Sequence, residues 1–352
     1  MIIFGIETSC DETAASIVED GVREICSVVA SSKEFHEKTG GIVPEIAARK
    51  QVEAIVPVIA QCFEKFKDIK KYENIEDCYK DIDAIAVTTG PGLIGSLIVG
   101  VEAAKALALF LNRPIIPVNH LVGHIYGNFL DAENLDNKKI EFPAVVLLVS
   151  GGHTDLVLMK GHGDFEFIGG TLDDAVGEAF DKVARLLGLS KYLGGAVLSK
   201  KAQECNVNTI KGKLPRPMLD QDNFDFSFSG LKTATKRLVE KENYPVEVVA
   251  REFENAVVEV LVKKTMKAVR KYDVKSVLLG GGVSANTPLR ETIKKECEKI
   301  EVDCFVPPLR LCTDNAITIA SAAYFMYASE QEKYENLDLK GIQPDPSLGI
   351  MD

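Results

Sequence analysis

The sequence has few histidines, no C-x-x-C pair and fewer basic than acidic residues. Eight cysteines are scattered along 352 residues, a pattern more typical of reduced thiols in a cytosolic protein than of a disulfide framework or a zinc ribbon. Lys and Arg number 41 against 52 Asp and Glu, so the net charge is −11. This excess of acid argues against a chain that binds nucleic acid over its whole surface, because phosphate contacts need Lys and Arg.

Signals for secretion and for membrane insertion are also missing. Residues 1–5 carry no basic segment and no cleavage-site pattern, so we expect no signal peptide. The most apolar stretch, Leu97 to Leu111, contains Glu102 and Lys105 and is too short to cross a bilayer. We therefore expect a cytoplasmic protein without a membrane partner.

Strand and helix patterns alternate along the chain, and the opening pattern occurs twice. Residues 2–6 and 14–18 read as two strands around a polar turn, and residues 142–149 and 155–159 repeat this arrangement after a polar linker at 131–141. A length of 352 residues corresponds to about two domains. The repeat predicts a duplicated α/β fold. Further helices are expected at 44–66, 96–111, 121–130, 172–187, 246–269 and 287–300, and further strands at 82–88, 115–118 and 276–279.

Three acids and three hydroxyls crowd the first turn, between Glu7 and Thr13. Backbone N–H groups and hydroxyls in such a turn can hold a phosphate, and carboxylates such as Asp11 and Glu12 can bind a metal or accept a proton. Asp, Ser and Thr are also common in ordinary hairpin turns, so a purely structural role stays open.

Two of the five histidines, His120 and His124, are four residues apart. On a helix both rings lie on one face, where they can share a metal or form separate hydrogen bonds. Leu121 stands where the H-E-x-x-H motif has its general base, which argues against a metalloprotease. Asp314 fits either a helix N-cap or a third ligand of a site suited to iron or zinc.

Glycine-rich turns follow two buried strands, at 150–154 and at 280–286. Glycines at a strand end permit close approach of a ligand to the backbone, and the strand–turn–helix context of Gly280 to Asn286 suits a nucleotide. Both segments are equally compatible with ordinary turns. No G-x-G-x-x-G followed by an acid is present, so a nicotinamide-dependent dehydrogenase is disfavoured.

Nine short motifs occur along the chain, at residues 7–13, 41–45, 90–93, 120–124, 150–154, 173–182, 226–232, 280–286 and 312–315. Taken together, these motifs resemble the tRNA N6-adenosine threonylcarbamoyltransferase family, formerly called O-sialoglycoprotein endopeptidase, from Met1 to about Ala323. His153 and residues 177–182 resemble the bacterial and mitochondrial branch, and Leu148 replaces a metal-binding tyrosine of the archaeal branch.

The resemblance implies a duplicated actin/hexokinase-like fold with two lobes around a nucleotide cleft. The expected lobes are residues 1–130 and 141–325, with the helices after about 312 packing back on the first lobe and a tail at 326–352. The implied reaction moves threonylcarbamoyl from threonylcarbamoyl-AMP to N6 of adenosine 37 in tRNAs that read ANN codons. Alternatives are a carbamoyltransferase for a small molecule or a protein, a small-molecule kinase of the same fold, and a silent scaffold.

By motif, the resemblance assigns His120, His124 and Asp314 to one divalent metal, Fe²⁺ in preference to Zn²⁺, and Asp11 and Glu12 to the reacting centre. The family's prolines are missing around Gly194 and Gly195, which makes the Gly195 contact an open question. The adenylate contacts carried over are Leu148, Val149, Ser150, Gly151, Gly152, Asp181, Gly195, Ser199 and Asn286.

Implied partners are tRNA, a synthase that supplies the adenylate, an inactive paralogue of the same fold and a small P-loop ATPase. Between Lys182 and Arg216 there are eight basic residues and one acid, which is compatible with a solvated loop or with a tRNA-docking patch on an otherwise acidic body. The predicted patch consists of Lys191, Lys200, Lys201, Lys211, Lys213 and Arg216.

Overall fold

In the computed structural model the chain divides into two compact units, which are described separately. The structure describes residues 1–130, 139–207, 209–242 and 244–351. Unit 1 contains residues 1–139, 162–164 and 307–352, and unit 2 contains residues 140–161 and 165–306. Most of the expected linker at 131–141 lies outside the described residues.

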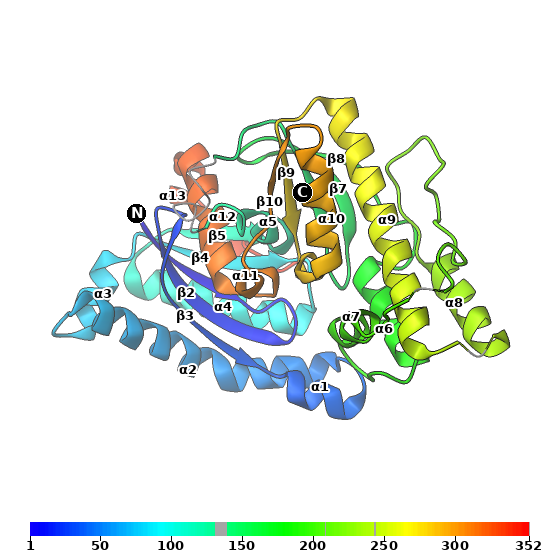
Figure 1. Cartoon of the computed structure of the whole chain (residues 1–352). Helices are drawn as coiled ribbons and strands as arrows, with labels where there is room; N and C mark the ends of the chain where they lie inside the picture. The colour runs from blue at the N-terminus through cyan, green and yellow to red at the C-terminus, as the bar shows by residue number, and fades with distance from the viewer. Residues whose placement is uncertain (131–138, 208, 243, 352) are drawn as a thin grey trace. The chain divides into compact units, whose positions relative to one another are not determined.

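Unit 1 is built on a five-stranded sheet in the order β3-β2-β1-β4-β5 (Figure 1). The central strand β1 pairs antiparallel with β2 and parallel with β4. The strands are β1 (Ile2–Glu7), β2 (Glu12–Glu19), β3 (Arg23–Ser31), β4 (Ala84–Gly90) and β5 (Ile115–Asn119). The helices are α1 (Lys33–Thr39), α2 (Pro44–Lys70), α3 (Ile75–Asp81), α4 (Ile94–Leu111), α5 (His120–Tyr126), α11 (Leu309–Cys312), α12 (Ala316–Ser329), α13 (Gln331–Glu335) and the short η3 (Leu339–Gly341).

Helices cover both faces of this sheet. Phe4 stacks on Phe63 of α2 with ring centroids 4.7 Å apart. The next residue, Gly5, faces α12 so closely that a Cβ there would lie 2.6 Å from the carbonyl oxygen of Ala316. Because neighbouring residues of a strand point to opposite faces, α2 and α12 lie on opposite sides of β1. This explains why every residue of β1 is buried.

Unit 2 has a five-stranded sheet in the order β10-β9-β6-β7-β8. Read from its other edge, as β8-β7-β6-β9-β10, this is the strand order of unit 1. The central strand β6 pairs antiparallel with β7 and parallel with β9, as β1 does with β2 and β4. The predicted duplication is therefore confirmed. The strands are β6 (Ala144–Val149), β7 (Thr154–Gly161), β8 (Asp164–Gly170), β9 (Ser276–Gly280) and β10 (Asp303–Phe305), and the helices are α6 (Val176–Leu186), α7 (Gly194–Gln203), α8 (Ser229–Lys241), α9 (Val246–Tyr272), η2 (Gly282–Ala285) and α10 (Thr287–Glu298).

The chain enters unit 1 again at Pro307, a few residues before the expected point at about 312. The segment expected as a tail packs on this unit. Asp345 donates its backbone N–H to the carbonyl oxygen of Thr89, and Asn119 donates its side-chain amide to the carbonyl oxygen of Gly349. The end of the chain thus lies at the carboxyl ends of β4 and β5.

The apolar stretch that was expected to be too short to cross a bilayer is longer in the structure, because α4 already begins at Ile94. At 18 residues α4 is long and apolar enough to cross a membrane by length and composition, the one helix of which this holds in the described part of the chain. A single helix of this kind is weak evidence, because core helices of α/β units share these features. α4 packs on β4 and α2, and Gly100 lies directly against the Thr8 side chain. We therefore interpret α4 as a core helix with one exposed side. All eight cysteines are free, as predicted.

Candidate metal and nucleotide sites

Strand β5 leads without a break into α5, and this junction places both histidines of the H-x-x-x-H pair. Asn119 ends the strand and caps the helix, accepting a hydrogen bond from the N–H of Leu121 at 2.9 Å. His120 and His124 then occupy consecutive turns with ring centroids 4.6 Å apart. The Leu121 side chain is buried.

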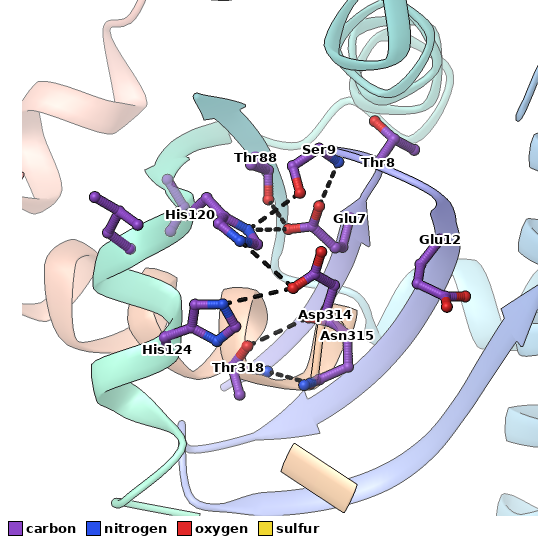
Figure 2. Close-up of polar contacts among 12 residues, drawn as sticks. Glu7, Thr8, Ser9, Glu12, Thr88, His120, His124, Asp314, Asn315 and Thr318 are labelled. Atoms are coloured by element: carbon purple, nitrogen blue, oxygen red, sulfur yellow. Dashed lines mark hydrogen bonds and ion pairs between the residues drawn. The ribbon is translucent and has the colours of Figure 1, made fainter. Parts of the chain in front are cut away.

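The third member of the cluster comes from the segment between α11 and α12. Asn315 caps α12 by accepting a hydrogen bond from Thr318 N–H at 3.0 Å, so Asp314 is not the cap. Asp314 Oδ1 lies 3.5 Å from Nε2 of His120 and 3.5 Å from Nε2 of His124 (Figure 2). The structure therefore brings the three predicted ligands together, with one ligand atom from each within 4.8 Å of the others.

The donor set suits a divalent cation. Two imidazoles and one carboxylate with room for further ligands are typical of non-haem Fe²⁺, and they are also compatible with Zn²⁺. His120 has a supporting acceptor on its other ring nitrogen, because its Nδ1 lies 3.1 Å from Glu7 Oε2. A carboxylate at this position fixes the orientation and tautomer of a metal-binding histidine.

Glu7 is buried at the end of β1 and has a full set of partners. It accepts hydrogen bonds from Ser9 N–H and from the hydroxyl of Thr88 at 2.5 Å. Sequence reasoning placed Glu7 in the first turn without giving it a role. Its signal is its position, since a carboxylate that directly follows five buried strand residues needs specific partners.

Opposite charges in this cluster shift pKa values strongly. Burial by itself acts to lower the pKa of His120, but the carboxylates of Glu7 and Asp314 outweigh it and raise that pKa to about 9. Burial acts to raise the pKa of Asp314, yet the two histidines lower it to about 2. In the metal-free site the His120 ring is therefore protonated at neutral pH and lies between the carboxylates of Glu7 and Asp314.

The predicted catalytic acids lie in the turn that leads into β2. Glu12 Oε1 accepts a hydrogen bond from Ser31 at 2.8 Å, while its buried Oε2 has no hydrogen-bond partner. Burial raises the pKa of Glu12 to about 7, against the effect of the Ser31 bond. Figure 2 shows Glu12 apart from the two histidines, with no dashed line that joins it to their hydrogen-bond network. The carbonyl oxygen of Asp11 accepts a hydrogen bond from Ser32.

A residue that sequence reasoning missed holds this turn in place. Gln51 of α2 is buried, and its Nε2 donates to the carbonyl oxygens of Thr8, Cys10 and Glu12 at 3.0–3.3 Å. The sequence does contain a sign of this role, because Gln51 is an amide on an otherwise apolar face of its helix.

Unit 2 gathers most of the predicted nucleotide contacts around the end of β6. Gly177 at the start of α6 donates its N–H to the Ser150 carbonyl oxygen at 3.1 Å. Gly281 adopts a φ of +84°, and a Cβ there would collide with the Val149 carbonyl oxygen. By contrast, a Cβ on Gly151 or Gly152 would meet no atom within 4 Å. The backbone after β6 is thus closely packed on one side and open on the other, as a ligand requires.

Helix α7 carries two more of these residues on one face. Asp181 accepts a hydrogen bond from Gly195 N–H at 3.1 Å, and burial raises its pKa. Ser199, one turn later, lies 3.3 Å from Asn286 Nδ2. Leu148 and Val149 are both fully buried. The Val149 side chain belongs to the hydrophobic core of unit 2, whereas Leu148 points to the opposite face of the sheet.

The six residues of the predicted tRNA patch differ in whether their charges are paired with a carboxylate. Arg216 is 15% exposed and binds Glu252 and Glu259 at 2.7 and 2.8 Å. Lys201 and Lys213 also have carboxylate partners. Exposed side chains without an ion pair to any described residue remain at Lys191, Lys200 and Lys211.

The sequence matches the model of the tRNA N6-adenosine threonylcarbamoyltransferase family from residue 24 to residue 321. The chain belongs to this family. A relative of that name from Bacillus subtilis (strain 168) is 50% identical over 328 residues, which cover 92% of this chain and 89% of the relative. Another from Thermosipho africanus (strain TCF52B) is 45% identical and covers 99% and 98%.

Solved structures of more distant proteins share the fold of this threonylcarbamoyltransferase family member. HypF of T. kodakarensis covers 95% of this chain with a TM-score of 0.62 and 15% identity, and the match covers 48% of HypF. Component A of the (R)-2-hydroxyglutaryl-CoA dehydratase of Acidaminococcus fermentans covers 93% of this chain and 99% of its own, with a TM-score of 0.52 and 14% identity. The predicted actin/hexokinase-like fold class is confirmed.

Proposed function

We propose that this chain transfers the threonylcarbamoyl group from threonylcarbamoyl-AMP to N6 of adenosine 37 in tRNAs that read ANN codons. The cluster of His120, His124 and Asp314 carries the proposal, in a chain whose 45–50% identical relatives bear this enzyme's name. A small-molecule kinase has no role for this cluster, and a silent scaffold has no need of it.

The cluster would hold one divalent metal, Fe²⁺ in preference to Zn²⁺, because two imidazoles and one carboxylate are the ligand set typical of non-haem iron. When bound, such an ion supplies Lewis-acid stabilisation of negative charge on the phosphate of the adenylate. Glu7 would fix the ring of His120 through the 3.1 Å contact to Nδ1.

Glu12 is the candidate general base for the adenine amine, with Asp11 as the alternative. A pKa of about 7 leaves Glu12 partly ionised at neutral pH, and its Oε2 has no hydrogen bond to lose when it accepts a proton. The substrate needs no protein nucleophile, because its acyl group is already activated as a mixed anhydride with AMP.

Unit 2 would bind the adenylate. The open backbone at Ser150, Gly151 and Gly152 would receive it, with Asp181, Gly195, Ser199 and Asn286 around it. The missing prolines near Gly195 are compensated in part by the Asp181 hydrogen bond, which fixes the start of α7.

The tRNA would contact the exposed lysines Lys191, Lys200 and Lys211, with smaller contributions from Lys201 and Lys213, whose charges are already paired. Reversing the first three charges should weaken tRNA binding and reduce its salt dependence. Reversing Lys201 and Lys213 serves as the matched control, and equal losses in both variants would contradict the assignment.

The inactive paralogue would dock on the outer side of α2 and α4. Val52, Val56, Ile94 and Ile98 are 46–70% exposed there, on two helices that pack together. Clustered exposed apolar side chains are typical of protein interfaces. Val56→Lys should abolish a complex with the paralogue in size-exclusion chromatography, and a complex that persists would contradict this placement. The ATPase and the adenylate synthase are further expected partners.

The decisive experiment is nucleoside analysis of tRNA after incubation with the chain, pre-made threonylcarbamoyl-AMP and each partner in turn. The proposal predicts threonylcarbamoyladenosine in the digest and its loss when His120 is replaced by Ala. Transfer of phosphate from ATP instead of threonylcarbamoyl would contradict the proposal. The absence of threonylcarbamoyladenosine from every combination of partners would also contradict it.

A further inference from the structure

Gln51 of α2 acts on the turn between β1 and β2 through its donor atom alone. Its side chain is 1% exposed, and Nε2 donates to the carbonyl oxygens of Thr8, Cys10 and Glu12 at 3.3, 3.0 and 3.1 Å. Three acceptors around one atom fix the orientation of the amide, because Oε1 in that place would face three carbonyl oxygens. Oε1 is itself buried without a hydrogen-bond partner among the described residues. Such an atom costs stability, so the amide is favoured here by its donors.

The backbone of this turn is held by outside donors along its whole length. The carbonyl oxygen of Ser9 accepts a hydrogen bond from Leu93 N–H at 2.8 Å. That of Asp11 accepts from the N–H and the hydroxyl of Ser32 at 2.9 and 2.8 Å. With the three bonds from Gln51, the carbonyl oxygens of all five residues from 8 to 12 have a donor. The course of the turn therefore depends strongly on Gln51, which binds three of the five.

Glu12 is the residue of this turn whose proposed chemistry depends most on its placement. Its carboxyl accepts a hydrogen bond from Ser31 through Oε1, and its backbone is fixed by Gln51. This leaves Oε2 for the proton of the adenine amine. A general base must lie within hydrogen-bond reach of the proton that it accepts, and a displacement of about 1 Å can lower the rate on the order of 100-fold. Gln51 is buried, so it can affect this step only through the turn.

We propose that Gln51 is a positioning residue of the transfer reaction, which holds the Glu12 carboxyl at the reacting centre by fixing the carbonyl oxygens of Thr8, Cys10 and Glu12. The inference rests on the proposed function, in which Glu12 accepts the proton of the adenine amine. The hydrogen bonds of Gln51 go to the turn and not to the metal ligands. Loss of Gln51 should therefore slow the transfer step and leave the binding of metal and nucleotide unchanged.

Single-turnover measurements on Gln51→Met test this role, with the full chain, pre-made threonylcarbamoyl-AMP, tRNA and the partners that support transfer. Methionine is unbranched like glutamine but has no hydrogen-bond donor. The rate constant at saturating adenylate should fall about 10- to 100-fold. The affinity for AMP and the Zn²⁺ content after equilibrium dialysis should equal those of the wild-type chain. Gln61→Met is the matched control, because Gln61 is an exposed residue of the same helix, and it should transfer at the wild-type rate.

A double-variant cycle with Glu12→Gln tests whether Gln51 acts through Glu12. Once the carboxylate is absent its placement no longer matters, so Gln51→Met should slow the Glu12→Gln chain much less than it slows the wild-type chain. Gln51→Glu keeps the test open if Gln51→Met does not fold. A buried carboxyl that faces carbonyl oxygens stays protonated at neutral pH and donates one hydrogen bond. This variant should therefore lose part of the rate, with unchanged affinity for AMP, and the same cycle can be measured with it.

The contrary outcomes are distinct. A folded Gln51→Met chain that transfers at the wild-type rate would overturn the inference, as would a wild-type rate in Glu12→Gln. Equal slowing of the wild-type and Glu12→Gln chains by Gln51→Met would show that Gln51 does not act through Glu12. Loss of metal or AMP binding in proportion to the loss of rate would leave Gln51 a structural role only. No transfer by the wild-type chain with any combination of partners would instead overturn the proposed function, and the inference with it.

Discussion

The turn after β1 and the turn after β6 occupy the same position in two sheets of the same strand order, but they carry different chemistry. The first is rich in side-chain acids and lies beside an imidazole cluster. The second exposes bare backbone at Gly151 and Gly152. The two units thus share a strand order but differ in the turn after the central strand. The turn of unit 1 offers side chains as ligands, and the turn of unit 2 offers its backbone.

This contrast predicts that unit 1 is most sensitive to substitutions that remove a metal ligand or a charge. Unit 2 should be most sensitive to substitutions that add a side chain where the backbone is closely packed. The largest effect is expected for His120→Ala and His124→Ala. Each removes one of three ligands, so affinity for Fe²⁺ or Zn²⁺ should fall at least about 100-fold, beyond the loss typical of an outer partner. Metal content after equilibrium dialysis measures it.

His162→Phe provides the control for these two variants. His162 stacks on Phe325 with centroids 4.1 Å apart, and a phenyl ring preserves that contact. It should bind metal like the wild-type chain. Equal metal loss in all three variants would indicate a general folding defect, and no loss in either alanine variant would refute the metal site.

A smaller effect is expected for Glu7→Gln. The amide keeps the shape of Glu7 but removes the negative charge that orients His120. Metal affinity should fall about 10- to 100-fold, the range for outer partners of metal-binding histidines. Isothermal titration with Zn²⁺ would show it. An unchanged affinity would mean that Glu7 acts only on the turn, through Ser9 and Thr88.

Unit 2 should respond to a single added methyl group. Gly281→Ala places a Cβ against the Val149 carbonyl oxygen at a φ of +84°, which should lower the free energy of unfolding by about 2–3 kcal/mol. Gly282→Ala is the matched control, because a Cβ there meets nothing within 4 Å. Urea denaturation of both variants compares them, and equal stability would argue that the backbone at Gly281 can relax.

The strands and helices that could be predicted from the sequence are those marked by a pattern of neighbouring residues. β1, β4, β6 and β9 are largely apolar, fully buried strands and were expected close to their observed bounds. β3 was missed because it is an edge strand with few buried positions, among them Cys26 and Val28. α6 begins at Val176, later than expected, because the preceding residues form a turn instead of a helix. There the Thr171 hydroxyl donates to the Asp174 carbonyl oxygen, and Asp173 accepts a hydrogen bond from the N–H of Phe228.

The same distinction applies to the sites. The His120–His124 spacing is local and visible, whereas the convergence of Asp314 on it rests on tertiary structure. The residues alone left Asp314 as either a helix N-cap or a third ligand, and the resemblance assigned it to the metal. Which of Asp314 and Asn315 caps α12 could not be decided from sequence, since both residue types cap helices. Gln51 was missed because its partners are remote in sequence.

The smallest expected effect is a pH dependence confined to unit 1. The pKa of His120 is raised from 6.5 to about 9, so its protonated form stabilises the metal-free fold fully below about pH 6.5 and loses that contribution as the pH rises through 9. Asp314 and Glu7 have lowered pKa values, so their contributions disappear only in acid. Glu12, raised to about 7, has largely finished titrating by pH 8. Between pH 7 and 9 the metal-free chain should therefore lose on the order of 2 kcal/mol of unfolding free energy. His120→Ala, measured by the same urea titrations, should lack this slope, and a slope that persists in that variant would assign the titration to another group.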